Sequence, residues 1–271
     1  MPLAVCATPI GNLADVTLRV LETLREAEVV LCEDTRHTRL LLDRHGISAR
    51  LVSFHEHNEA ERTAEMLPRL EAGELIALVS DAGMPGISDP GGRLIRAALA
   101  AGMVVSVLPG PSAVETALVA SGFVAERYTF VGFLPRRATE LAALWEELRG
   151  VLWPLVAFES PRRLPGSLAS LAAVLPEREV AVCRELTKRF EEVVRGPAEE
   201  VAELFGQAPK GEITLVVGPG ERAPDELAGV VAEARRAVAD LVASGSPRGA
   251  AAEVVARLTG VSRNELYRST L

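Results

Sequence analysis

Two short polar segments of the sequence combine residue types that can bind a substrate and move a proton. Residues 33–38 contain Glu33, Arg36 and His37, and residues 53–58 contain His55 and His57. Histidine titrates near neutral pH, a carboxylate can accept a proton, and the guanidinium group of arginine binds phosphates well. Each segment follows an apolar run that is typical of a buried strand. These five residues are therefore candidates for substrate contact or acid–base catalysis.

The histidines also raise the alternative of a metal site, because all four histidines of the chain lie between residues 37 and 57. A His-x-His sequence on a strand places both rings on one face, and Glu33 or Asp34 would add a carboxylate. A third ligand at a standard spacing is missing, so no metal is expected. Helix capping and structural hydrogen bonds are the remaining interpretation for part of this set.

Three loops are rich in residues that bend the backbone. Residues 8–13 read TPIGNL, residues 80–92 read SDAGMPGISDPGG, and residues 109–113 read PGPSA. The second loop contains four glycines, two prolines and two aspartates, and such a composition turns backbone N–H and C=O groups outward toward a small ligand. The two aspartates would repel a polyanion, so this loop suits a ligand with amine or hydroxyl groups and positive charge. In the third loop, Ser112 is well placed to cap a following helix, whose free N–H groups suit a carboxylate.

The elements that position these loops alternate between short apolar runs and amphipathic stretches. Strands are predicted at residues 3–7, 29–33, 49–54, 75–80 and 104–108, and helices at 16–27, 38–45, 59–72 and 93–101. This alternation predicts a parallel sheet covered by crossover helices, and ligands bind such sheets beyond the carboxyl ends of the strands. The sequence lacks both G-x-G-x-x-G and G-x-x-x-x-G-K-[ST], which disfavours the common dinucleotide and nucleoside triphosphate folds.

The second half of the chain predicts a different sheet and a helical end. Strand-like runs occupy residues 128–132, 155–158, 179–185, 191–194 and 213–217, with fewer helices than strands between them. Such a ratio implies a mixed or partly antiparallel sheet. Residues 225–271 are expected to be helical, with breaks at residues 244–247 and 259–260. We therefore predict an α/β domain at residues 1–112, a second α/β domain at residues 113–220, and a helix-turn-helix-like tail at residues 221–271.

Composition narrows the function classes. The 271 residues carry a formal net charge of −8, which excludes a strongly basic nucleic-acid-binding chain. No apolar run approaches the ~20 residues that cross a bilayer, and no secretory signal is expected. The three cysteines, Cys6, Cys32 and Cys183, are odd in number and far apart. They are interpreted as buried thiols of a protein in the reducing cytoplasm, with no membrane partner.

Eight segments agree in order and spacing with one group of enzymes. They are residues 8–13, 33–36, 55–58, 80–92, 109–113, 158–162, 184–188 and 211–212. On these motifs the sequence resembles the tetrapyrrole (corrin/porphyrin) methylase superfamily, and within it the branch of small-subunit ribosomal RNA (cytidine-2′-O)-methyltransferases. The resemblance covers nearly the whole chain, including the helical tail.

The resemblance implies a two-domain α/β fold with a mostly parallel N-terminal sheet, a mixed second sheet and a C-terminal helical extension. It also implies a homodimer that binds S-adenosylmethionine in the cleft between its domains. The methyl group would go to the ribose 2′-hydroxyl of a decoding-centre cytidine in 16S ribosomal RNA. Carried onto this chain, the cofactor-binding residues are Pro9, Gly11, Ser80, Asp81, Ala82, Gly83, Ser88, Pro109, Ser112 and Ala113.

Methyl transfer to a hydroxyl group requires an acceptor for the hydroxyl proton. We expect Glu33, His37, His55 or His57 to orient or deprotonate the ribose hydroxyl, because these residues lie at the ends of neighbouring strands. Arg36 would hold an adjacent phosphate.

The uneven charge of the chain predicts local recognition of RNA. Residues 1–126 carry 10 basic and 17 acidic side chains, whereas residues 127–195 carry 11 and 9. A shaped, preassembled small ribosomal subunit is therefore favoured over free RNA as the substrate. The expected RNA-binding residues are Arg136, Arg137, Arg162, Arg163, Lys188 and Arg189.

Two alternatives stay open. The first is another enzyme of the same superfamily, with a porphyrinoid or a protein as the methyl acceptor. The second is a non-catalytic module that binds the ribosome.

The helical tail would contact RNA or another ribosomal component, or it would stabilise a dimer.

Overall fold

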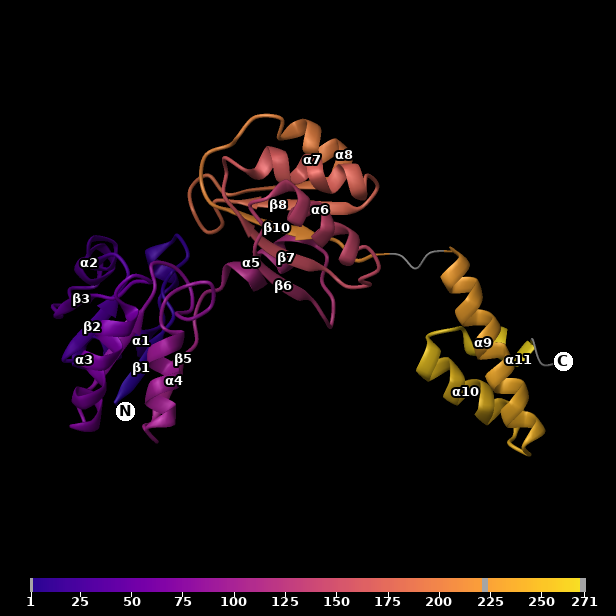
Figure 1. Ribbon diagram of the computed structural model, residues 1–271, viewed down its shortest axis with the longest axis horizontal. Helices are drawn as coiled ribbons and strands as arrows, with labels where there is room; N and C mark the ends of the chain where they lie inside the picture. Colours follow the sequence, from indigo (N-terminus) through magenta and orange to yellow (C-terminus); the bar gives the residue numbers. More distant parts are fainter. Residues whose placement is uncertain (1, 221–223, 269–271) are drawn as a thin grey trace. The chain divides into compact units, whose positions relative to one another are not determined.

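The computed structural model describes residues 2–220 and 224–268, which divide into two compact units (Figure 1). The first unit contains the chain up to Arg149 together with Trp153–Pro219, and the second contains Gly150–Leu152 and the residues from Gly220 onward. Two sheets lie in the first unit and a group of helices forms the second. The division of the first unit at residue 112 stays a prediction.

The first sheet is parallel throughout, as the alternating pattern predicts. Its strands are β1 (Leu3–Cys6), β2 (Val29–Cys32), β3 (Leu51–Ser53), β4 (Ile76–Val79) and β5 (Val105–Leu108), in the spatial order β3-β2-β4-β1-β5. Because all five strands run in one direction, their carboxyl ends share one edge. The central strands β4 and β1 are neighbours, so the loops that follow them lie side by side at this edge.

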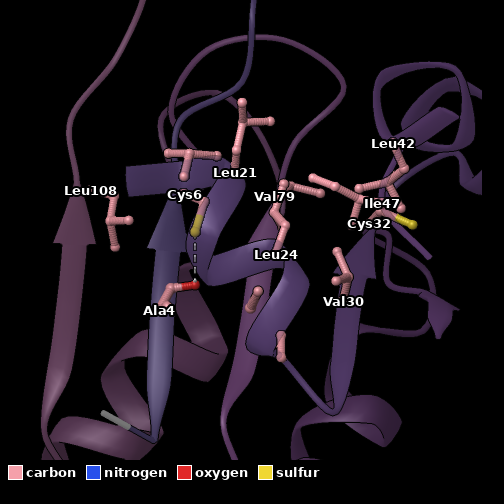
Figure 2. Packing of buried hydrophobic residues seen from close by; sticks show 13 residues of the cluster. Ala4, Cys6, Leu21, Leu24, Val30, Cys32, Leu42, Ile47, Val79 and Leu108 are labelled. Atoms are coloured by element: carbon pink, nitrogen blue, oxygen red, sulfur yellow. Dashed lines mark hydrogen bonds between the residues drawn. The ribbon is translucent and has the colours of Figure 1, made fainter. Parts of the chain in front are cut away.

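Helices cover this sheet because its strands are apolar on both faces. They are the short 3-10 turn η1 (Leu13–Asp15), α1 (Leu18–Glu26), α2 (Thr35–Arg44), α3 (Glu59–Glu71) and α4 (Gly92–Ala100). Alternate strand residues belong to two separate cores. One core joins Cys6 and Val79 to Leu21 and Leu24 of α1, and Figure 2 shows these side chains together. The other core joins Leu3 and its neighbours to α3 and α4.

The second sheet is mixed, which confirms the sequence prediction. Its strands are β6 (Thr129–Phe133), β7 (Leu155–Glu159), β8 (Glu179–Arg184), β9 (Glu192–Pro197) and β10 (Ile213–Val217), in the order β6-β7-β10-β8-β9. Only β6 and β7 pair in parallel, and the other neighbours are antiparallel. Its helices are α5 (Ala113–Ser121), α6 (Ala138–Glu147), α7 (Leu164–Val174) and α8 (Ala198–Leu204). Helix α5 packs on this sheet through Val114, Ala117 and Leu118.

The second unit has a small core of its own. Its helices are α9 (Pro224–Ala243), α10 (Arg248–Thr259) and α11 (Arg263–Arg268), and both breaks between them lie where the sequence predicts them. Val238, Ala252 and Leu266 are fully buried among these helices. Gly260 ends α10 with φ 72°, a conformation that favours glycine at a helix end. Among the described residues, no helix is both long and apolar enough to span a membrane.

Candidate active site

The loops after β1 and β4 are tied together at the carboxyl edge of the first sheet. The Thr8 N–H donates to the Gly83 carbonyl at 2.9 Å, and the Gly83 N–H donates to the Thr8 carbonyl at 3.1 Å. The Ser80 hydroxyl donates to the same Gly83 carbonyl at 3.1 Å, and Gly83 has φ 77°. Ser80 is only 3% exposed, so its hydroxyl is a buried group that stabilises the turn at Gly83.

A cavity of about 330 Å³ opens beside this loop. Of the ten predicted cofactor-binding residues, five line it: Ala82, Gly83, Ser88, Ser112 and Ala113. The other wall comes from the second sheet and includes Phe133, Phe158 and Thr214. Pro9, Gly11, Ser80, Asp81 and Pro109 are not in the lining. The third predicted loop therefore contributes through its helix start, where Ser112 occupies the N-cap but donates its hydroxyl to Glu115 and makes no capping bond.

Gly11 makes a close approach to the loop after β8. An added Cβ would lie 2.8 Å from Thr187 Oγ1 and 3.0 Å from the Leu186 carbonyl oxygen. The neighbouring Asn12 N–H donates to Thr187 Oγ1 at 3.0 Å. Thr187 has φ 65°, and its N–H donates to the Glu191 carboxylate at 2.6 Å, which holds the loop in place. Gly11 therefore brings two parts of the first unit together, a role that the sequence alone did not indicate.

Gly11→Ala is expected to lower the free energy of unfolding by about 1–3 kcal/mol, because the methyl group would overlap the 186–188 loop. Urea unfolding monitored by circular dichroism measures the change. Gly166→Ala is the control, since Gly166 lies inside α7 and the Cβ of an alanine there would meet no neighbouring atom outside the helix's own backbone. The control should be neutral or stabilising, and an equal loss in both variants would contradict the assigned contact.

A group of carboxylates meets at the same edge of the first sheet. The Asp34 N–H donates to Asp81 Oδ1 at 3.1 Å, which joins the loops after β2 and β4. Asp89 lines the cavity, and burial, together with the charges of Glu33 and Asp81, raises its pKa to about 7. Burial and the charges of Asp81 and Glu56 also raise the pKa of Glu33, whereas the charge of His55 acts to lower it. The Asp89 carboxyl group thus gains or loses its proton near neutral pH, and the carboxylates at this edge would favour a bound cation.

The predicted catalytic histidines have different surroundings. His55 lies in the turn after β3, close enough to Glu33 to influence its pKa, and its Nδ1 is buried with no hydrogen-bond partner among the described residues. Its ring contacts that of His57 edge to face, with the centroids 5.9 Å apart. His37 is exposed on the first turn of α2. Within residues 2–220 and 224–268, no three His, Cys, Asp or Glu side chains are grouped to hold a metal.

Arg36 and His45 make local contacts. The Arg36 guanidinium is 90% exposed and binds the Asp34 carboxylate through Nε at 3.1 Å and Nη2 at 2.8 Å. His45 Nε2 lies 3.2 Å from the Leu13 carbonyl oxygen. His45 therefore has a structural hydrogen bond, whereas Arg36 keeps an accessible charge at the surface.

The six predicted RNA-binding residues fall into two groups. Arg136, Arg137, Arg162 and Arg189 are exposed. Lys188 bonds Glu185 at 2.9 Å and Glu212 at 3.0 Å. Arg163 donates to the carbonyls of Leu134 and Pro135 at 2.9 and 2.6 Å. These last two cations thus have internal structural partners.

A buried carboxylate supports Arg163. The Glu159 side chain is fully buried beside the cavity, and its Oε2 lies 3.1 Å from Arg163 Nη2. It also accepts hydrogen bonds from the Ser160 N–H and the Ser167 hydroxyl. Asp89, Phe133 and Glu159 were not among the site residues predicted from the sequence. Asp89 had a usable signal, since it lies between Ser88 and Pro90 in the loop already singled out.

Two family models match the chain. Residues 2–202 match "Tetrapyrrole (Corrin/Porphyrin) Methylases", and residues 228–271 match "RsmI C-terminal HTH domain". The chain is 46% identical to "Ribosomal RNA small subunit methyltransferase I" of Mesorhizobium japonicum, over 98% of this chain and 90% of that protein. It is 44% identical to a protein of the same name from Thermotoga maritima, over 81% of this chain and 99% of that protein.

Solved structures share the fold. The methyltransferase CobJ has a TM-score of 0.62 at 18% identity and covers 82% of this chain and 96% of its own. A uroporphyrin-III C-methyl transferase from Thermus thermophilus, described as complexed with S-adenyl homocysteine, has a TM-score of 0.56 at 21% identity. That match covers 80% of this chain and 96% of the other. Together with the two sheets, these likenesses confirm the predicted fold class.

Proposed function

Because the chain belongs to the tetrapyrrole (corrin/porphyrin) methylase family, we propose that it is an S-adenosylmethionine-dependent methyltransferase of ribosomal RNA. The acceptor that we assign is the ribose 2′-hydroxyl of a decoding-centre cytidine in the 16S RNA of the small subunit. The observation that carries this proposal is the 46% identity, over 98% of the chain, to a relative named for methylation of small-subunit ribosomal RNA.

The lining of the cavity fits this cofactor, which supplies a methyl group bound to a cationic sulfur. None of the described lining residues is lysine or arginine, whereas the Asp89 carboxyl group is among them. The turn at Ala82 and Gly83 presents small side chains to the cavity, and the start of α5 presents backbone N–H groups. Such groups suit the amine, carboxylate and hydroxyls of the cofactor, and the carboxyl group of Asp89 suits its positive charge.

We assign the proton of the acceptor hydroxyl to the group formed by Glu33, His55 and His57. The raised pKa of Glu33 makes its carboxylate a stronger base than an exposed one. The Nδ1 of His55 has no hydrogen-bond partner among the described residues, and the His55 ring lies close enough to Glu33 to influence its pKa. Arg36 and His37, both exposed on the first turn of α2, suit the RNA backbone next to the acceptor.

The exposed arginines in the loops of the second sheet suit the same substrate. Arg136, Arg137, Arg162 and Arg189 provide local positive charge in a chain of net charge −8. Local contacts of this kind favour a folded RNA surface within an assembled subunit, and such a substrate places the enzyme in the cytoplasm. The tail, whose helices match a helix-turn-helix model, would add a further RNA contact.

An exposed apolar edge of the first sheet favours a homodimer. Val107 of β5 is 56% exposed and Leu99 of α4 is also 56% exposed, next to Val104 at 61%. Strand β5 is the outer strand, with a neighbour on one side only. Apolar groups gathered at a sheet edge are typical of a surface that pairs with a second copy.

Val107→Arg is expected to convert the dimer into a monomer, because two like charges would meet in a pairing of identical edges. Sedimentation equilibrium at micromolar concentration measures the mass. Leu40→Arg is the control, since Leu40 is 62% exposed on α2, which contacts β3 at the opposite edge of the sheet. A Val107→Arg protein that sediments like the wild type would show that this edge is not the interface.

A transfer assay with labelled S-adenosylmethionine tests the proposed function. The acceptors are small ribosomal subunits that lack the methyl group, free 16S RNA, a porphyrinoid and total protein. We expect label in the RNA of assembled subunits and much less in free RNA. Label only in the porphyrinoid or in protein would support another enzyme of the family, and binding of the cofactor without transfer would support a non-catalytic module.

A further inference from the structure

Phe133 is an exposed aromatic side chain at the wall of the cavity. Its exposed fraction is 62%, although it ends strand β6 and lines the cavity together with Phe158. An isolated exposed apolar residue needs no explanation, but one that lines a pocket offers a flat surface to whatever enters.

The backbone holds this ring in a defined place. The pairing of β6 with β7 shifts register between Phe130 and Phe133, and Gly132 has φ 72° in this bulge. Bulges of this kind redirect a side chain next to an active site. Phe133 also contacts Phe158 edge to face, with centroids 5.5 Å apart at 62°, and Phe158 packs on Phe130 at 5.0 Å.

Hydrogen bonds fix the residues just after the ring. The Leu134 N–H donates to the Phe158 carbonyl at 3.1 Å, and Leu134 is 2% exposed. Arg163 holds the Leu134 and Pro135 carbonyls, and the buried Glu159 carboxylate holds Arg163. Arg163 is therefore a positioning residue for Phe133, and its contact with RNA stays a prediction.

Two exposed arginines, Arg136 and Arg137, follow the ring within four residues. An aromatic platform beside exposed guanidinium groups is the combination that binds an unstacked base and its phosphates. Arg137 also bonds Glu140 at 2.9 Å, and its side chain stays 80% exposed. The cofactor carries no phosphate, whereas an RNA nucleotide is flanked by phosphates, so these arginines suit the RNA better than the cofactor. The opposite wall holds Asp89, which suits the cationic cofactor.

On the basis of the function proposed above, we propose that Phe133 is the platform on which the base of the acceptor nucleotide stacks. The base would leave its own stack, as enzymes that act within folded nucleic acid commonly require. The ribose that carries the stacked base would then direct its 2′-hydroxyl into the cavity, toward the cofactor.

Kinetics of the full-length chain on assembled small subunits test this assignment. Phe133→Leu is expected to raise the KM for subunits about 10- to 100-fold, the range that loss of one base–aromatic stack produces. Its affinity for S-adenosylmethionine should stay within about twofold of the wild type, and Phe133→Trp should restore KM. Leu204→Ala removes a side chain that is 71% exposed on α8 and should leave both values unchanged.

A substrate lacking the base provides the decisive comparison. Subunits reconstituted with an abasic ribose at the target retain the 2′-hydroxyl but have nothing to stack. Phe133→Leu should then have no further effect on KM, because the two changes remove the same contact. An undiminished effect on the abasic substrate, an unchanged KM on normal subunits, or a parallel loss of cofactor affinity would overturn the proposal. A wild-type protein that fails to methylate subunits would instead refute the proposed function.

Discussion

Asp89→Asn is expected to weaken binding of S-adenosylmethionine at pH 8 by about 10- to 100-fold, because a charged hydrogen-bonding partner contributes about 1.5–3 kcal/mol. In the free protein, burial and the charges of Glu33 and Asp81 hold the pKa of Asp89 at about 7. A bound cation would favour the carboxylate, so binding should release a proton near neutral pH. Affinity of the wild type should therefore rise from pH 6 to pH 8, and the variant should lose this dependence.

Isothermal titration calorimetry in buffers of different ionisation enthalpy measures both affinity and proton release. The amine of the cofactor titrates in the same way with the wild type and with Asp89→Asn. The difference in proton release between the two proteins therefore comes from Asp89. Asp43→Asn is a suitable control, because Asp43 is an exposed residue of α2. If the variant kept the proton release of the wild type, Asp89 would not be the partner of the cation.

The same carboxyl group predicts a pH dependence of stability. Asp89 has a folded pKa of about 7, above its ordinary value of 3.8. Between these values the folded protein keeps a proton that the unfolded chain has lost. Its contribution to the free energy of unfolding is thus fully present below about pH 4 and is lost as pH rises through 7. Comparison of urea midpoints of wild type and Asp89→Asn across this range should show the difference.

Glu159→Ala is expected to lower the free energy of unfolding by about 3 kcal/mol, because it removes a fully buried carboxylate that satisfies two hydrogen-bond donors and the partly buried Arg163. The Ser160 N–H and the Ser167 hydroxyl would lose their acceptor, and Arg163 would lose its carboxylate. Urea unfolding measures the loss. Arg163 still has two carbonyl partners in the variant, so the loop should remain folded, although less firmly placed.

An exposed pair serves as the control for Glu159. Glu146 binds Arg149 at 2.9 Å, and both side chains are more than half exposed. Glu146→Ala should therefore change stability by less than about 1 kcal/mol. Similar losses for Glu146→Ala and Glu159→Ala would mean that the buried carboxylate does not support the loop.

The sequence predicted the two sheets well because their signal is local. Val29–Cys32 and Ile76–Val79 are fully buried apolar strands, and turn-forming residues follow both. The helices between them show apolar positions at helical spacing, which reports the face they bury. Ser112 was placed correctly at the start of α5, but its hydroxyl bonds Glu115 because the choice of partner depends on side-chain packing.

The site was predictable only where its residues lie next to one another in the chain. The Ser80–Gly92 loop carries its own turn chemistry, so its place at the cavity followed from composition. The role of Gly11 depends on its contact with Thr187. The neighbouring hydrogen bond, from Asn12 to Thr187, joins residues that are 175 positions apart in the chain. The pKa of Asp89 likewise depends on Glu33, which follows a different strand, and the placement of Phe133 depends on a bulge. Sequence periodicity indicates which face of a helix or strand is buried, so it does not predict such long-range contacts.

Locating the transferred methyl group tests the proposed function most directly. Small subunits that lack the modification would be incubated with the protein and labelled S-adenosylmethionine, and their RNA digested and examined by mass spectrometry. We expect one methyl group on the ribose of one cytidine, where it blocks alkaline cleavage of the adjoining phosphodiester. A methyl group on a base, or RNA without label while a porphyrinoid becomes labelled, would contradict it.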